Sequence, residues 1–163
     1  MKNNKGFSLV ELIIVIAIMA VLVGVLAPTY LQYVEKSKKS NDVSTVDSIV
    51  NAVEIGAIDP EVMTDATKSL TITITNADGS FLITPSTESG ATGKWKAVVE
   101  AAVGTDIKLK SSNWDNTAGG TANTVKIVAT RDVATGKVIF KYDSATAASF
   151  KTYATSLTKV KNS

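Results

Sequence analysis

The side chains of this sequence offer little to a catalytic site. None of its 163 residues is a cysteine or a histidine, so a thiol nucleophile, the usual general base and the commonest metal ligand are missing. Catalysis would need a serine–lysine pair or two paired carboxylates, and no spacing in the sequence singles out either. We therefore expect a protein that is not an enzyme and that carries no cofactor.

The loop expected from Ser111 to Asn123 is rich in Gly, Asn and Thr, and it contains Asp115 and Asn116. Their oxygens raise the question of calcium, which takes roughly 6–8 oxygen ligands, several of them from carboxylates. With one Asp and no Glu, this loop predicts no metal site, although the sequence alone leaves calcium open.

One carboxylate stands in an unusual setting. From Phe7 to Ala27, 21 residues contain a single formal charge, that of Glu11. A helix rises ~1.5 Å per residue, so this segment is long enough to cross a hydrocarbon core of ~30 Å. A lone carboxylate in lipid costs roughly 2.5–3.5 kcal/mol, whereas at a helix N-terminus the dipole stabilises it by ~0.3–1 kcal/mol. Glu11 is thus either a helix-end carboxylate or a residue kept for assembly.

Three interpretations compete for this N-terminal stretch. A secretory signal peptide would be cut best after Ala27, which would leave Pro28 at the new N-terminus, and the apolar run is long for such a peptide. An ordinary membrane anchor explains the length but not Glu11. The third interpretation rests on the hexapeptide Gly6-Phe7-Ser8-Leu9-Val10-Glu11, which follows Lys2 and Lys5.

That hexapeptide resembles the processing site of type IV pilins, a family that includes the pseudopilins of type II secretion. The family pattern is a short basic leader ending in Gly, an aromatic residue, Glu four residues later and an apolar helix, and all four parts are present in order. Pro28 also falls where many members carry a helix-interrupting proline. The resemblance covers about residues 1–53.

The resemblance implies a sequence of events. A prepilin peptidase would cut after Gly6 and methylate the amine of Phe7, and the subunit would wait in the cytoplasmic membrane with its leader inside. A cytoplasmic assembly ATPase and a membrane platform protein would then draw subunits into an extracellular homopolymer. Glu11 would be the assembly residue.

The expected fold is α+β, with a long N-terminal helix packed on a small antiparallel sheet of four or five strands and short helices. Pro28 lacks an N–H and Gly24 is a poor helix former, so this turn is the expected weak point of the helix. Beyond it, Glu35 to Asp42 is polar on every face, which indicates either a solvated helix or contact with neighbouring subunits or lipid headgroups. The expected domains are a leader (1–6), an apolar helix (7–28), its amphipathic continuation (29–56) and a globular head (57–163).

Periodicity and turn residues predict the elements of the head. The long helix carries an apolar stripe of Val43, Val46, Ile49, Val50 and Val53 and stops at Gly56, and a short helix then opens at Asp59-Pro60-Glu61 and runs to about Lys68. Next come strand 70–75, a turn at Asp78-Gly79, strand 81–83, a loop from Pro85 to Gly93 and a helix that carries Trp95, Val98, Val99 and Ala102. The last elements are a strand at 107–110, a hairpin of 125–130 and 137–142 that turns at 134–136, and a terminal helix whose apolar face is Phe150, Tyr153, Ala154 and Leu157.

Trp95 lies on the apolar face of its helix and is expected in the core. For Trp114, a surface role and a packed-down loop are equally supported by the sequence. Without Lys2 and Lys5 the chain has 15 basic and 15 acidic side chains, which predicts no general affinity for nucleic acid.

The most favoured function is therefore a major pilin, and two alternatives remain. One is a pseudopilin or minor pilin, which shares the N-terminus. The other is a membrane-anchored binding domain that never polymerises. The sequence does not distinguish adhesion, motility, DNA uptake and secretion as roles of the fibre.

Overall fold

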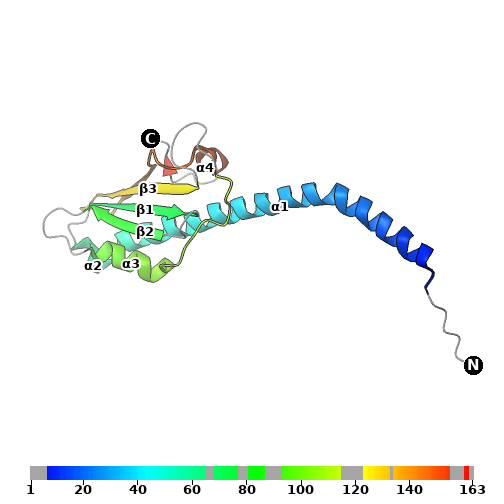
Figure 1. Cartoon of the computed structure of the whole chain (residues 1–163). Coiled ribbons are helices and arrows are strands. Elements are labelled where there is room, and N and C mark those ends of the chain that lie inside the picture. Colours follow the sequence, from blue (N-terminus) through cyan, green and yellow to red (C-terminus); the bar gives the residue numbers. More distant parts are fainter. Residues whose placement is uncertain are drawn as a thin grey trace, which may run out of the picture. The chain divides into compact units, whose positions relative to one another are not determined.

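The computed structural model describes residues 7–64, 68–76, 81–86, 93–114, 123–132, 134–154 and 160–161. The chain divides into two compact units, Met1–Ser37 and Lys38–Ser163. The elements in order are α1 (Leu9–Ala57), α2 (Pro60–Met63), β1 (Ser69–Thr75), β2 (Phe81–Ser86), α3 (Lys94–Val103), β3 (Thr124–Arg131), β4 (Val138–Tyr142), α4 (Ala148–Tyr153) and β5 (Val160–Lys161). This is the expected α+β arrangement of one long helix, a small sheet and short helices (Figure 1).

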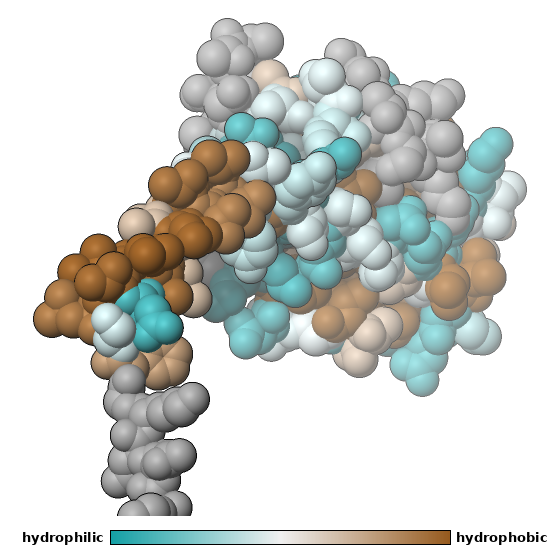
Figure 2. Space-filling model, turned by 90° about the vertical axis from the view of Figure 1, so that its right-hand side faces the viewer, coloured by the Kyte–Doolittle hydropathy of each residue, from teal (hydrophilic) through white to brown (hydrophobic). Residues whose placement is uncertain are grey.

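The described part of the first unit is the first part of α1, from Leu9 to Ser37, with the two residues before it. The helix continues without a break through Gly24 and Pro28. Between Phe7 and Leu31 every large apolar side chain is exposed, from 43% for Val15 to 84% for Phe7. Figure 2 shows these side chains as an almost continuous brown surface. The helix is long and apolar enough to cross a membrane.

The second unit is built on a sheet of order β2-β1-β3-β4-β5. The first four strands pair antiparallel, whereas β5 lies parallel to β4. The alternation of Leu70, Ile72 and Ile74 places all three on one face, as the strict Thr/Ile alternation predicts. Cross-strand partners continue this face: Ile83, Ile72, Ile127 and Tyr142 form one row, and Leu70, Ala129, Phe140 and Val160 form another.

The C-terminal half of α1 and helix α3 cover this inner face of the sheet (Figure 1). Four members of the expected stripe of α1, Val46, Ile49, Val50 and Val53, are at most 2% exposed, and Val43 is partly buried against the same core. Trp95 is fully buried on α3, as expected, and its indole N–H donates to the carbonyl of Val53 at 3.0 Å. Each fully buried side chain of this kind contributes ~1.5–3 kcal/mol, so the stripe fixes the helix to the head.

Several expected boundaries are wrong, each for a local reason. α1 ends at Ala57 rather than at Gly56, which lies inside the helix where α3 passes closely: a Cβ on Gly56 would meet Val98 Cγ1 at 3.3 Å. Pro85 belongs to β2 and not to a loop, because β2 is an edge strand where no ladder N–H is required. Helix α2 begins at Pro60 behind its Asp59 cap, as expected, but it ends at Met63.

Residues 107–110 do not form the expected strand. The backbone N–H of Lys110 donates to the carboxylate of Asp42, and the carbonyl of Leu109 accepts from the Asn76 side chain. These groups are therefore satisfied by side chains instead of a strand neighbour. The second hairpin is confirmed, with Gly136 at φ 70 in its turn.

The remaining comparisons concern elements outside the described residues and the C-terminal part of the head. The Asp78-Gly79 turn, the 115–122 part of the loop and Leu157 lie outside the described residues. Helix α4 confirms part of the terminal helix face: Phe150 within the helix and Ala154 just after it are buried, whereas Tyr153 is 38% exposed. Strand β5 was not expected, because two residues are too short for a periodic signal.

Arg131, the one arginine of the chain, extends the inner face of β3. Its Nη1 donates to the carbonyls of Val62 at 2.8 Å and Ala57 at 3.4 Å, which belong to α2 and to the last residue of α1. Its guanidinium also lies 5.3 Å from the ring centroid of Trp95. A cation at two helix C-terminal ends is favourably placed, so Arg131 ties α1, α2 and α3 to the sheet.

Candidate functional site

The N-terminal end of α1 is the candidate site, and Ser8 and Glu11 shape it. The backbone N–H of Ser8 donates to Oε2 of Glu11 at 2.9 Å, and the N–H of Val10 donates to Oγ of Ser8 at 3.4 Å. The carbonyl of Ser8 accepts the first helical hydrogen bond, from Leu12. Ser8 is thus the N-cap and Glu11 the third helical residue of a capping box.

The capping box satisfies backbone donors that would otherwise be free at the helix start. It also holds the Glu11 carboxylate near the positive end of the helix dipole. The Ser-x-x-Glu spacing was present in the sequence, but the capping role of Ser8 was not anticipated there. Both residues follow Gly6, so removal of residues 1–6 would leave the box intact.

The other residues expected in this site divide into two groups. Gly6 lies outside the described residues, and Phe7 precedes α1 with 84% of its surface exposed. Gly24 and Pro28 both lie inside the unbroken helix, and nothing lies within 4 Å of the position of a Cβ on Gly24. Glu11 is the one acidic residue in the first turn, with Phe7 four residues before it.

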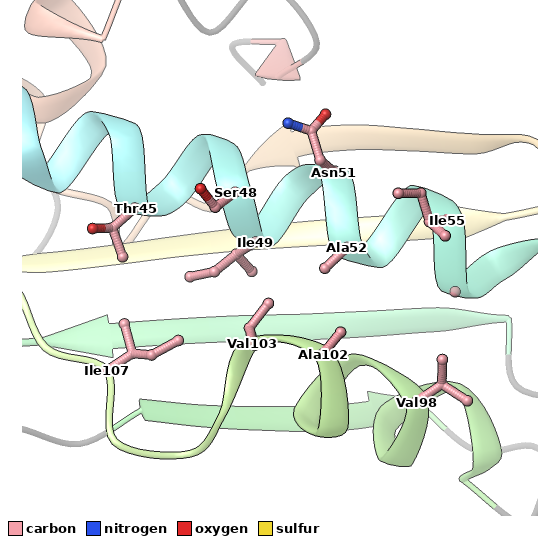
Figure 3. A pocket seen from close by; sticks show the side chains of 11 residues that line it. Thr45, Ser48, Ile49, Asn51, Ala52, Ile55, Val98, Ala102, Val103 and Ile107 are labelled. Atoms are coloured by element: carbon pink, nitrogen blue, oxygen red, sulfur yellow. The ribbon is translucent and has the colours of Figure 1, made fainter.

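A second candidate lies in the head, where α1 and α3 border an open groove of about 560 Å³ (Figure 3). Its lining carries no charged side chain, and its apolar members include Ile49, Ile55, Val98 and Ile107. The hydroxyls of Thr45 and Ser48 donate to backbone carbonyls one turn earlier in α1. These hydroxyls are thus engaged by the helix, and the groove offers no nucleophile–base pair.

The described residues contain no group of three or more His, Cys, Asp or Glu side chains that could hold a metal. Asp115 and Asn116, the calcium candidates, lie outside those residues. Trp114 is 1% exposed, so the surface role is wrong and the packed-down loop is correct. Its ring meets Phe150 edge-on with centroids 4.9 Å apart.

Asp42 is the residue whose burial the sequence pattern predicts least well. The sequence pattern places it in a polar, solvated run, yet it is 1% exposed. Its carboxylate accepts from the N–H groups of Lys110 and Ser111 and from Nε1 of Trp114, at 2.7, 3.0 and 2.9 Å. Lys39 lies over the Trp114 ring, 4.9 Å from its centroid. Three donors from one loop thus replace the water that an exposed aspartate would bind.

The fold and the site together define a class: an α+β head on a long helix whose capped N-terminal half is apolar and exposed. The first 27 residues match the family described as the prokaryotic N-terminal methylation motif. The chain is 35% identical over 68 residues to two fimbrial proteins of Pseudomonas aeruginosa, which covers 41% of this chain and 44% of each relative. It is 36% identical over 56 residues to the type IV major fimbrial protein FimA of Dichelobacter nodosus, covering 34% of this chain and 36% of that protein.

The chain thus spans less than half the length of the curated relatives it matches. No solved structure matches it. The motif and these relatives confirm the resemblance to type IV pilins, and the matching part of the chain is the part that carries the capping box and the apolar helix.

Proposed function

We propose that this chain is a structural subunit, a major pilin, of an extracellular type IV pilus-like filament. The observation that carries the proposal is the difference in exposure between the two parts of α1. Its first part, within the match to the methylation motif, exposes an almost continuous apolar surface, and one face of its last part is buried in the head. Exposed apolar surface of this extent marks a membrane or protein interface, and a helix that carries both parts links the head to that interface.

Processing is the first step of the proposed function. A prepilin peptidase hydrolyses the peptide bond between Gly6 and Phe7, which releases the leader as a carboxylate and leaves an amine on Phe7. A methyl group from a methyl donor then replaces one hydrogen of that amine. This step removes the leader, 1–6, and the proposed mature chain then consists of the apolar helix 7–28, its continuation 29–56 and the head 57–163.

The membrane stage comes second. The apolar helix crosses the cytoplasmic membrane as a single pass, with the leader lysines on the cytoplasmic side and the head outside. An α-helix suits this environment because its backbone hydrogen bonds are made within the segment. Membrane lipid is then the partner of the exposed surface between Phe7 and Leu31.

Assembly is the third step, in which helix–helix contacts replace lipid contacts. Lipid tails are as apolar as leucine, so apolar burial alone gives no direction to this exchange, and packing with specific polar pairs must supply it. The charged pair available is the Glu11 carboxylate and the Phe7 amine of a neighbouring subunit. The assembly ATPase and the platform protein act on the subunit indirectly, by moving it out of the membrane.

The test is the intact mass of the protein purified from a strain with a working prepilin peptidase. We expect a chain that starts at Phe7 and carries one added methyl group. Gly6→Val should abolish cleavage, because a small residue is needed before the cut, whereas the matched Gly24→Val should still be cleaved. A mature N-terminus at Met1 or at Pro28 would end the proposal. Imaging of long surface fibres then separates a major pilin from a pseudopilin, which would yield none.

A further inference from the structure

Two tyrosines lie in α1 just beyond the apolar run from Phe7 to Ala27. Tyr30 and Tyr33 lie in α1 with exposed fractions of 67% and 68%, on the turns that follow Pro28. They are three positions apart in the sequence, so they lie on neighbouring parts of one helix face. A tyrosine joins an apolar ring to a hydroxyl, and such side chains favour the level of the lipid headgroups at a membrane surface.

The distance from Glu11 to Tyr30 matches the thickness of a hydrocarbon core. The helix is unbroken between these residues, and 19 steps of ~1.5 Å give about 28 Å along its axis. A bilayer core is ~30 Å thick, so when Tyr30 lies at one boundary of the core, Glu11 lies at the other. The apolar side chains between them, from Leu12 to Leu26, then fill the core.

We infer that Tyr30 and Tyr33 bind the headgroup layer of the outer leaflet and set the depth of the subunit, so that Glu11 lies at the inner headgroup layer. This inference rests on the membrane stage of the proposed function. It removes the difficulty of a carboxylate in lipid, because Glu11 and its capping partner Ser8 meet water and headgroups. The surface that the tyrosines continue is the exposed apolar face of α1 (Figure 2).

A different register follows if the apolar run alone decides the depth. The run from Phe7 to Ala27 is centred on Ala17, and Glu11 would then lie about 6 Å inside the core. With Glu11 and Tyr30 at the two boundaries, the midplane falls between Ala20 and Val21. The two registers differ by three to four residues, or about 5 Å along the helix, which a depth measurement can resolve.

Because the chain has no cysteine, a single introduced cysteine can be labelled without labelling any other residue. Single cysteines are placed in turn from position 13 to position 29 of the full chain and labelled with a nitroxide. The chain is reconstituted in dioleoyl phosphatidylcholine vesicles. The ratio of the label's accessibility to oxygen and to a water-soluble nickel chelate then reports the depth of each position. We expect the deepest position between Ala20 and Val21.

Variants of the two tyrosines test their part in setting the depth. Tyr30→Leu with Tyr33→Leu removes the aromatic boundary, so that the stretch between Glu11 and the next charged residue, Glu35, decides the depth. The centre of that stretch is Val23, and the deepest position should move toward it. Tyr30→Trp with Tyr33→Trp keeps interfacial aromatic rings and should leave the deepest position unchanged. A deepest position at Ala17 that does not respond to the leucine pair would overturn the inference.

Fibre counts on the same variants keep the inference separate from the proposed function. A chain that is centred on Ala17 and still forms fibres refutes only the membrane register. A chain that fails to enter the vesicles contradicts the membrane stage of the proposed function itself. Loss of fibres by the leucine pair with no change in depth would also overturn the inference, because the tyrosines would then serve a second copy of the chain rather than lipid.

Discussion

Trp114 donates a hydrogen bond from Nε1 to Oδ2 of Asp42 across 2.9 Å, and both side chains are 1% exposed. This bond joins helix α1 to a loop residue that lies 72 positions after Asp42 in the chain. Asp42 lies shortly after the start of the second compact unit, which begins at Lys38. Asp42 and Trp114 therefore fix the beginning of the part of α1 that belongs to the head.

The first prediction concerns Asp42→Ala. It leaves the donors on Lys110, Ser111 and Trp114 buried without an acceptor, at ~1–3 kcal/mol for each unsatisfied group before the loop relaxes. We expect the free energy of unfolding to fall by about 3 kcal/mol in total. Urea denaturation of the full chain in detergent micelles, followed by tryptophan fluorescence, measures it.

Asp47→Ala is the matched control, because Asp47 lies on the same helix but its side chain is exposed and accepts a single long bond from Asn51. It should change stability by less than about 0.5 kcal/mol. Equal losses in the two variants would show that the Asp42 cluster adds nothing beyond helix charge.

The second prediction concerns Tyr142, whose phenol oxygen is buried without a hydrogen-bond partner among the described residues. Tyr142→Phe removes this oxygen and keeps the ring against Phe150, so stability at pH 7 should stay the same or rise by up to about 1 kcal/mol. The exposed Tyr33→Phe should leave it unchanged. A loss of about 2 kcal/mol or more in Tyr142→Phe would show that the oxygen does have a partner.

The same residue predicts a pH dependence. Burial raises the pKa of Tyr142 from 10.0 to about 12, because the folded head disfavours the phenolate. The unfolded chain therefore loses this proton first as the pH rises, and the stability that Tyr142 contributes is complete below pH 10 and declines between pH 10 and about 12. Unfolding curves across this range should show a smaller decline for Tyr142→Phe than for the wild type.

The sequence predicts the elements of the head correctly where a periodic apolar pattern coincides with one buried face of a helix or strand. The Leu70 to Thr75 alternation gave β1 to within one residue, and the spacing of Val46, Ile49, Val50 and Val53 gave the buried face of α1. Asp42 was missed because its burial depends on donors that lie far away along the chain. No local pattern distinguishes it from the exposed charges around it.

At the N-terminal site, too, local patterns are predictable from sequence, whereas contacts with distant partners are not. The Gly6 to Glu11 hexapeptide identified the family motif, and the family match over residues 1–27 confirms it. The capping bond from Ser8 to Glu11 is a local relation that the Ser-x-x-Glu spacing could have predicted. What the sequence and one subunit do not contain is the neighbour to which Glu11 would dock, so that role remains a prediction.

The third prediction concerns the turn from Gly24 to Pro28. In the fibre we expect this turn to lose regular helical hydrogen bonding, since Pro28 lacks an N–H and Gly24 is ~1 kcal/mol less favourable than Ala in a helix. Gly24→Ala meets no neighbouring atom within 4 Å, so it should restore helix there without a clash. Reconstructions of wild-type and variant fibres measure the effect. An unbroken straight helix over residues 20–32 in wild-type fibres would refute it.

The central claim is that the charge of Glu11 directs assembly. Because Glu11 also caps the helix together with Ser8, variants of these two residues can test the charge and the cap separately. Glu11→Gln keeps an oxygen that accepts from the Ser8 N–H but has no charge to pair with a neighbour's Phe7 amine. Ser8→Ala is the matched variant, because it removes the hydroxyl cap and keeps the charge. Leaving one buried charge without its partner costs ~3–5 kcal/mol in soluble proteins, far more than the ~1 kcal/mol of a cap.

The most direct measurement is the yield of sheared surface fibres relative to membrane-bound subunit when each variant is the sole copy expressed. Glu11→Gln and Glu11→Ala should insert into the membrane and fold their heads, yet yield few fibres, while Ser8→Ala should yield fibres near the wild-type level. Wild-type fibre yield from Glu11→Gln would contradict the account and leave Glu11 as a helix cap alone.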